Sequence, residues 1–216
     1  FQPLLYQVAL AVPWPAEIAS PLRHILHKAR NVRTVLGEVG GFDTDARRVR
    51  LTGGGEFGYD YLIVAAGARH AYFGHDEWAE QAPGLKTLED AVEIPRRLLL
   101  AFEKKERAAL LSGKQDPPTF PVIGGGPTGV ELAGAIADLA RLVLAKDFKA
   151  IDTRKARVRL YEGSARVLGT FSEESSRSAK RQLQELGVEV FTESMVTAVE
   201  PGQIKVGEEW VASDVT

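Results

Sequence analysis

The second half of the chain alternates short apolar runs with longer amphipathic segments. Residues 119–123, 158–161 and 188–191 are short, mostly apolar segments that predict strands. Helical patterns separate them, so the order is strand, helix, strand, helix, strand. That order predicts an α/β fold with a parallel sheet and right-handed crossover connections.

Two amphipathic helices are predicted between these strands. The first covers about residues 130–144, where apolar side chains recur every three to four positions. In the second, Ser172 precedes Glu173 and Glu174 as a helix cap would, and Gly187 is placed to end the helix. The polar residues 146–155 form an insert before the next strand.

The first half of the chain gives weaker signals. Residues 48–51 alternate as a strand would, and the glycines at 53–55 predict a turn. Residues 61–66 form a continuous apolar run that ends at Gly67. Such a run is typical of a strand buried on both faces of a parallel sheet.

A loop, a helix and a linker are predicted in the middle. The loop covers about residues 69–86, and the helix begins near Glu89 or at Pro95 and ends near Leu111. Proline favours the first helical turn, which makes Pro95 a candidate start. Residues 112–118 are the clearest linker, so we place a domain boundary near Asp116, between residues 1–116 and 117–216.

Composition excludes several function classes. The chain has 27 basic and 29 acidic residues, for a net charge of -2, which gives no electrostatic case for nucleic-acid binding. It contains no cysteine, so dithiol–disulfide chemistry and thiolate metal sites are excluded. His24 and His27 lack an acidic partner pattern, and we expect no metal site. No apolar run predicts a membrane-spanning helix.

The chain reads as a piece of a longer protein. It starts at Phe1 without an initiator methionine or a signal-peptide pattern, and residues 211–216 look like the entry to another strand.

The strongest motif follows the strand at 119–123. It is the G-x-G-x-x-G sequence Gly124-Gly125-Gly126-Pro127-Thr128-Gly129. In a strand–turn–helix context the first glycine makes the turn, the second lets the backbone approach a pyrophosphate, and the third lets the helix pack on the sheet. The helix N-terminus then offers N–H groups to the anion. The alternative is a glycine-rich turn without a ligand.

Glu162, at the end of the next strand, is the candidate acid for the ribose hydroxyls. It lies 33 positions after Gly129, against about 20 in the common fingerprint, and the polar insert accounts for the excess. A carboxylate there would repel the extra phosphate of NADPH, which favours NADH. Arg166 lies close enough in sequence to weaken that preference, and Glu162 could instead be a surface acid.

The chain resembles type II NADH dehydrogenases, single-subunit flavoproteins that pass electrons from NADH to quinone. The matching segments are residues 1–9, 18–23, 59–68, 72–76, 82–86, 101–103 and 124–134. The resemblance implies two Rossmann-like domains, with an NADH domain inserted in a split FAD domain. Residues 1–116 would be part of the FAD domain and residues 117–216 the NADH domain.

The resemblance also implies a set of cofactor contacts and a location. Flavin would lie near the backbone of Val39 and the turn Ala65-Ala66-Gly67. The first FAD-binding unit, the quinone segment and the C-terminal membrane-binding segment would lie outside this chain. The whole protein would be cytoplasmic and peripheral to the membrane.

Three residues depart from the family pattern. Ala66 stands where threonine is common, Pro121 lies within a predicted strand, and Pro95 within a predicted helix. Together they leave open a diverged or impaired copy.

The resemblance assigns hydride transfer from NADH to FAD, followed by electron transfer to quinone. Glu131, two residues after Gly129, would lie near the junction of nicotinamide and flavin and steer hydride or proton transfer. The alternative is an acid placed for the helix dipole.

Two other functions stay open. One is a related flavoprotein reductase that serves a small iron–sulfur protein of the ferredoxin or rubredoxin type. The other is a non-catalytic fragment that binds NADH. Exposed half-domain surface would also favour self-association, for instance as a homodimer.

Overall fold

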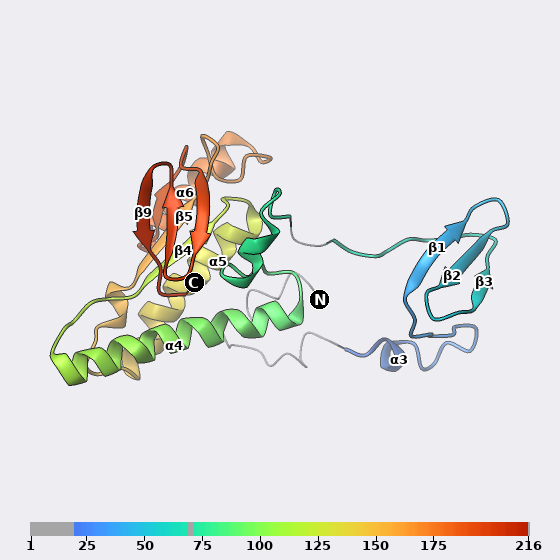
Figure 1. The fold of residues 1–216 in the computed structure, drawn as a ribbon, viewed down its shortest axis with the longest axis horizontal. Coiled ribbons are helices and arrows are strands. Elements are labelled where there is room, and N and C mark those ends of the chain that lie inside the picture. Colours follow the sequence, from blue (N-terminus) through green and yellow to red (C-terminus); the bar gives the residue numbers. More distant parts are fainter. Residues whose placement is uncertain (1–19, 69–70, 216) are drawn as a thin grey trace. The chain divides into compact units, whose positions relative to one another are not determined.

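The computed structural model describes residues 20–68 and 71–215. The described residues form two compact units, residues 20–68 and residues 71–215. Each is described by itself below, with the element labels of Figure 1.

The unit before residue 69 contains a short helix and a three-stranded antiparallel sheet. Helix α3 covers Leu22–Ile25. The strands are β1 (Val39–Asp43), β2 (Arg48–Leu51) and β3 (Glu56–Gly58), in the order β1-β2-β3. The predicted strand at 48–51 and the glycine turn that follows it are confirmed.

The strand expected over residues 61–66 is wrong. This segment has no strand pairing in the described part of the chain, and its side chains are exposed, with Tyr61 at 95% and Ile63 at 89%. A doubly buried parallel strand needs a neighbouring strand on each side. The small antiparallel sheet of this unit supplies none.

The unit after residue 70 is built on a parallel sheet. Its strands are β4 (Thr119–Ile123), β5 (Arg157–Tyr161) and β6 (Glu189–Phe191), in the order β4-β5-β6. Thr119 pairs with Arg157 and Ile123 with Tyr161. The predicted strands and the parallel order are confirmed.

Helices connect these strands as crossovers. Helix α5 covers Pro127–Asp138 and continues as a π-helix, Leu139–Val143, and a 3-10 turn, Leu144–Lys146. A further 3-10 turn, Thr153–Lys155, precedes β5. Helix α6 covers Glu173–Glu185, and the side chain of Ser172 accepts a hydrogen bond from the amide of Ser175. The predicted cap at Ser172 is therefore confirmed.

Pro121 fits in β4 because its backbone nitrogen faces away from the neighbouring strand β5. Gly124 donates its N–H to the carbonyl of Tyr161 in β5, whereas the N–H and carbonyl of Thr119 bond to Asp214 instead. Backbone groups alternate in direction along a strand. Residue 121 shares the parity of Thr119, so its missing N–H costs no bond to β5.

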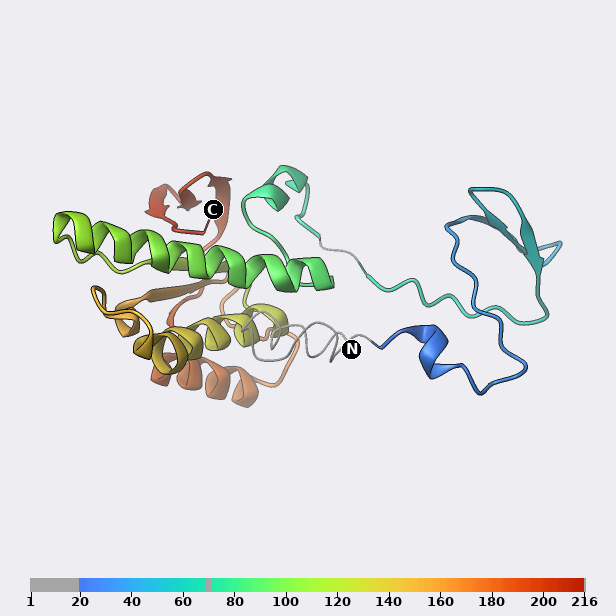
Figure 2. The ribbon, with the colours of Figure 1, turned by 90° about the horizontal axis from the view of Figure 1, so that it is seen from below.

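Helix α4, Leu88–Ser112, is the longest element of this unit. Thr87 and Asp90 form a capping box at its start, and Gly113 ends it with φ of 69°. The proposed start at Pro95 is wrong: Pro95 is buried inside the helix, and the capping box fixes the start about two turns earlier, at Leu88. Figure 2 shows α4 running along the side of the unit away from α6.

The core of this unit joins α4 to the parallel sheet. Phe102 of α4 is fully buried, with its ring centroid 5.2 Å from that of Phe120 in β4 and 5.7 Å from that of Phe148. The carboxylate of Glu106 accepts hydrogen bonds of 2.9–3.1 Å from the amides of Lys149, Ala150 and Ile151. This contact fixes the polar insert to α4.

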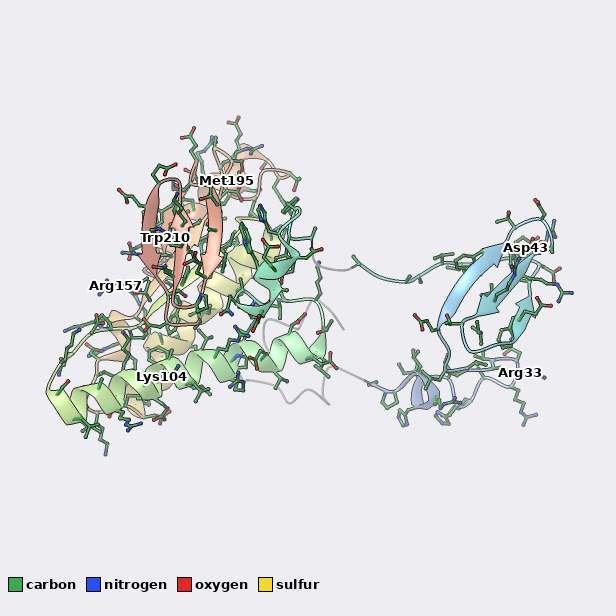
Figure 3. The ribbon with its side chains drawn as sticks, viewed as in Figure 1. Arg33, Asp43, Lys104, Arg157, Met195 and Trp210 are labelled. Carbon is green, nitrogen blue, oxygen red and sulfur yellow. The ribbon has the colours of Figure 1, made fainter. Side chains whose placement is uncertain are left out.

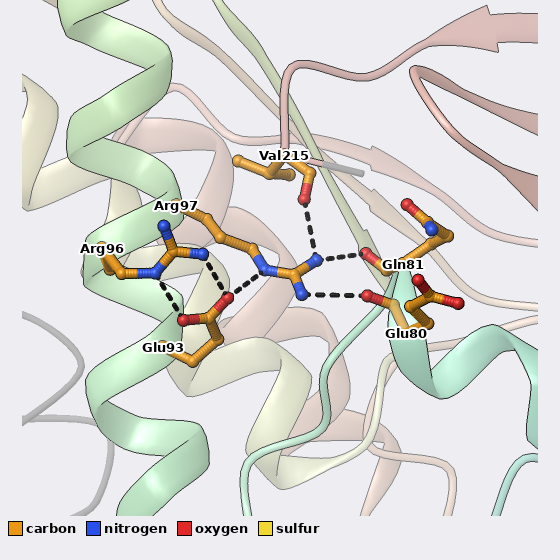
Figure 4. Close-up of polar contacts among 6 residues, drawn as sticks. All are labelled: Glu80, Gln81, Glu93, Arg96, Arg97 and Val215. Atoms are coloured by element: carbon orange, nitrogen blue, oxygen red, sulfur yellow. Dashed lines mark hydrogen bonds and ion pairs between the residues drawn. The ribbon is translucent and has the colours of Figure 1, made fainter.

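Arg97 attaches α4 to two other segments (Figure 4). Its guanidinium donates to the carbonyls of Glu80 and Gln81, at the end of the 3-10 helix Asp76–Glu80, at 2.9 and 3.0 Å. It also donates to the carbonyl of Val215 at 3.4 Å. Glu93 accepts from both Arg97 and Arg96, and these two arginines lower the pKa of Glu93 to about 2.

An antiparallel sheet that the sequence did not predict follows β6. Its strands are β7 (Val196–Glu200), β8 (Gln203–Val206) and β9 (Glu209–Ala212). Val196 and Ile204 are buried in a small core with Tyr161 of β5. The red strands in Figure 1 are this meander.

The boundary near Asp116 stays a prediction. It concerns binding domains of a whole protein, and the described units divide elsewhere. Across residues 20–68 and 71–215, no helix has the length and apolar character needed to cross a membrane.

Candidate nucleotide site

The turn after β4 has the shape that a dinucleotide-binding turn requires. Gly124 has φ of 100°, which favours glycine. Gly126 is the N-cap of α5 with extended backbone and no side-chain cap, and Pro127 is the first helical residue. The first N–H groups of α5 therefore meet no capping side chain and remain available to an anion.

The second and third glycines of the motif, Gly126 and Gly129, differ in how much space the structure leaves for a side chain. A Cβ on Gly129 would lie 1.9 Å from the carbonyl oxygen of Gly124, so only glycine fits where helix and strand meet. A Cβ on Gly126 would meet no described atom within 4 Å. Gly126 therefore borders open space, as expected of a backbone that a phosphate group would approach.

Glu162 lies directly against this turn. Its Oε2 atom accepts a 2.6 Å hydrogen bond from the N–H of Gly125. Its Oε1 atom accepts from the N–H of Ser164 at 2.7 Å and from the Ser164 hydroxyl at 2.5 Å. A carboxylate has about four acceptor positions, and these three hydrogen bonds leave one, on Oε2, for a further hydroxyl donor.

The charge of Glu162 is maintained by these contacts. Partial burial opposes ionisation, but the hydrogen bonds from Ser164 and Gly125 outweigh it and lower the pKa of Glu162. Glu162 is therefore an anion at neutral pH beside the first turn of α5.

Gly125 has its own steric requirement. A Cβ there would meet Cβ and Oε2 of Glu162 and Cγ1 of Val167, each at 3.0 Å. The carbonyl of Gly125 also accepts a 2.7 Å hydrogen bond from the amide of Leu168. The small residue lets the loop after β5 close against the turn after β4.

Arg166 is turned toward its own loop. Its guanidinium donates to the carbonyls of Phe171 and Gly169 at 3.0 and 2.9 Å. Arg166 was expected to weaken the preference for NADH by attracting the extra phosphate of NADPH, but its guanidinium is hydrogen-bonded to carbonyls of its own loop.

Thr128 is exposed on the first turn of α5, and Glu131 is exposed at the start of the second turn. Positions three apart share one face of a helix, so both lie on the side that continues from Gly126. Among the described residues Glu131 has no hydrogen-bond or ion-pair partner. Its role at the nicotinamide stays a prediction.

The expected flavin contacts lie in the other unit. Val39 is in β1 and is 47% exposed, and Ala65, Ala66 and Gly67 are exposed in the unpaired segment that follows β3. They belong to a different unit from Gly124–Gly129, and their role stays a prediction.

Two residues at the site were not foreseen from the sequence. The first is Ser164, whose hydroxyl donates to Glu162. The second is Met195, labelled in Figure 3, which packs closely on Gly163: a Cβ on Gly163 would lie 2.6 Å from Cε of Met195. A serine two positions after a strand-end acid is a signal that could have indicated the first. The contact of Met195 depends on the path of the loop after β6.

The sequence pattern of the family described as "Pyridine nucleotide-disulphide oxidoreductase" matches residues 1–214. The type II NADH:quinone oxidoreductases Ndh and NdhA of Mycobacterium tuberculosis are 46% and 43% identical to the chain, over 95% and 96% of its length. The chain spans 45% of each of these relatives, so it covers about half of their length.

Solved structures share the fold. NDH2 from Plasmodium falciparum, in complex with NADH, aligns with a TM-score of 0.81 at 22% identity, over 100% of this chain and 46% of that one. The sulfide:quinone oxidoreductase of Aquifex aeolicus aligns with a TM-score of 0.77 at 21% identity, over 99% and 48%. The α/β Rossmann-like fold class is confirmed. On the match over residues 1–214, the chain belongs to the pyridine nucleotide-disulphide oxidoreductase family.

Proposed function

We propose that this chain supplies the NADH-binding part of a flavin-dependent NADH:quinone oxidoreductase. One observation carries the proposal: open space borders Gly126 at the start of α5, and the ionised carboxylate of Glu162 lies on the neighbouring loop. The glycine turn would hold the pyrophosphate, and Glu162 would accept hydrogen bonds from the ribose hydroxyls. The 46% and 43% identical relatives are named as type II NADH:quinone oxidoreductases.

The residues present fit NADH better than NADPH. Glu162 carries a negative charge where the additional phosphate of NADPH would lie, and Arg166 is hydrogen-bonded to loop carbonyls. Repulsion between like charges would weaken NADPH binding.

The redox chemistry belongs to the flavin, which would accept hydride from NADH and release electrons to a quinone. The protein's contribution is position: Gly124–Gly129 would fix the pyrophosphate, and Glu131 would lie toward the nicotinamide from its exposed position at the start of the second turn of α5. Val39 and Ala65–Gly67 would contribute backbone contacts to the flavin. The whole protein would work at a membrane surface on the cytoplasmic side.

A binding titration tests the proposal. We expect the purified chain to bind NADH more tightly than NADPH, and Gly126→Val to abolish binding because its side chain would fill the space for the pyrophosphate. Gly41→Val is the matched control. A Cβ on Gly41 also meets no described atom within 4 Å, and Gly41 belongs to the other unit. Binding that survives Gly126→Val would contradict the proposed site.

A second measurement separates the alternatives. Visible flavin absorbance in the purified protein, bleached by NADH and restored by a quinone, would support the dehydrogenase. A colourless protein that binds NADH would favour the non-catalytic fragment. Restoration by an iron–sulfur protein but not by a quinone would favour the related reductase.

A further inference from the structure

The loop after β5 gives one side chain two contacts to the acid of the site. Ser164 donates both its backbone N–H and its hydroxyl to the same oxygen, Oε1 of Glu162, at 2.7 and 2.5 Å. The hydroxyl also lies 3.2 Å from the carbonyl of Arg166. A hydroxyl has one proton, and the shorter distance assigns it mainly to Glu162.

Ser164 is itself held from the other side. Its carbonyl accepts a 2.9 Å hydrogen bond from the amide of Glu193, and the carbonyl of Glu162 accepts one of the same length from Ser194. The loop that carries Glu162 and Ser164 is thus paired with the segment after β6. Ser164 has a fixed backbone from which its hydroxyl reaches the carboxylate.

These contacts determine which way the carboxylate faces. Oε2 points to Gly125 and Oε1 to Ser164, so the plane of the group is held at both oxygens. Without the hydroxyl, the Oε1 side would keep the single backbone donor and the side chain could rotate away from the turn.

We propose that Ser164 is a positioning residue that orients Glu162 and thereby sets the preference for NADH over NADPH. The inference rests on the proposed function of the site. Ser164 acts through Glu162 and would not itself need to touch the nucleotide.

The positioning role of Ser164 should also change the pH dependence of NADH binding, and the charged groups around Glu162 define that dependence. Arg166, on the same loop, donates to Phe171 and Gly169, and Glu193 contacts the loop through its backbone amide. The start of α5 adds a partial positive charge through its N–H groups. Hydrogen bonds from Ser164 lower the pKa of Glu162, so loss of the hydroxyl should shift the acid limb of NADH binding to higher pH.

The test compares Ser164→Ala, Ser164→Thr and Ser194→Ala in the full chain. We expect Ser164→Ala to reduce the ratio of NADH to NADPH affinity by about fivefold to tenfold, the net effect of one typical hydrogen bond. The acid limb of the pH profile of NADH binding should move to higher pH in Ser164→Ala. Ser164→Thr keeps a hydroxyl and should restore both values. Ser194→Ala is the matched control, because its hydroxyl donates to Thr192 and not to Glu162.

The outcomes separate this inference from the proposed function. If the unmodified chain binds NADH but Ser164→Ala keeps the same affinity ratio and the same acid limb, the positioning role is wrong while the site stands. If the unmodified chain binds neither nucleotide, the proposed function fails, and this inference fails with it. Equal shifts in Ser164→Ala and Ser194→Ala would assign the effect to general loosening of the loop and overturn the proposal.

Discussion

The backbone N–H of Gly125 donates a 2.6 Å hydrogen bond to Oε2 of Glu162. The two residues belong to different loops, one after β4 and one after β5, and a side chain on Gly125 would crowd Glu162 and Val167. This contact brings the glycine turn and the strand-end acid together, although 36 residues separate them in the sequence.

Gly129 and Gly126 should respond differently to alanine. In Gly129→Ala the new Cβ would collide with the Gly124 carbonyl, and we expect the free energy of unfolding to fall by about 3 kcal/mol. In Gly126→Ala the side chain enters open space, and the expected loss is under about 1 kcal/mol from the helix cap. Chemical denaturation of both variants measures the difference. Equal losses would show that the close approach at Gly129 is absent.

Glu162 should make stability depend on pH. Its pKa is lowered in the folded protein from 4.5. Its contribution is therefore fully present above about pH 4.5 and is lost as the pH falls through the lower folded-state pKa. Thermal unfolding across this range should show a decline in the unmodified chain that is smaller in Glu162→Gln. Parallel curves for the two proteins would contradict the hydrogen bonds to the ionised form.

Arg97 should matter more for stability than its neighbour Arg96. Replacing Arg97 with methionine removes the donors to the carbonyls of Glu80, Gln81 and Val215, and we expect a loss of about 2 kcal/mol. Arg96→Met removes a solvent-exposed ion pair to Glu93 and should leave stability nearly unchanged. Urea denaturation of both variants compares them directly. A larger loss in Arg96→Met would reverse the interpretation of Figure 4.

Glu106 should protect the amides of the polar insert. Its carboxylate accepts from Lys149, Ala150 and Ile151, and these contacts lower the pKa of Glu106. Hydrogen exchange at the three amides should accelerate in Glu106→Ala at neutral pH. In the unmodified chain the protection should be lost only as the pH falls through the lowered pKa. Glu103→Ala, on the exposed face of the same helix, is the control.

The sequence predicted the parts of this fold that local pattern determines. Strand β4 has the predicted bounds, and Ser172 caps α6, because hydrophobic periodicity and capping chemistry act over a few residues. Residues 61–66 were predicted wrongly because strand formation depends on neighbours that pattern cannot reveal. The meander β7–β9 was missed because its short strands mix polar and apolar residues and are only partly buried, so no apolar run marks them.

The candidate site divides in the same way. The motif located Gly124–Gly129 and the strand-end acid that follows, because Gly124, Gly125 and Gly129 each answer a steric need of the backbone. The sequence could not show that Arg166 turns to its own loop or that Ser164 holds Glu162. Those contacts depend on side-chain directions within a loop whose path is set by pairing with the segment after β6.

Pro121 should lower the tendency of the protein to aggregate through the edge of its parallel sheet. In the described part of the chain, β4 is an outer strand of the parallel sheet. Asp214 occupies the outward groups of Thr119, and the outward groups of the rest of β4 could template a foreign strand. Because Pro121 lacks an N–H on that side, an incoming strand would find a gap in the row of donors. Pro121→Val would complete the row, and a more aggregation-prone protein should result.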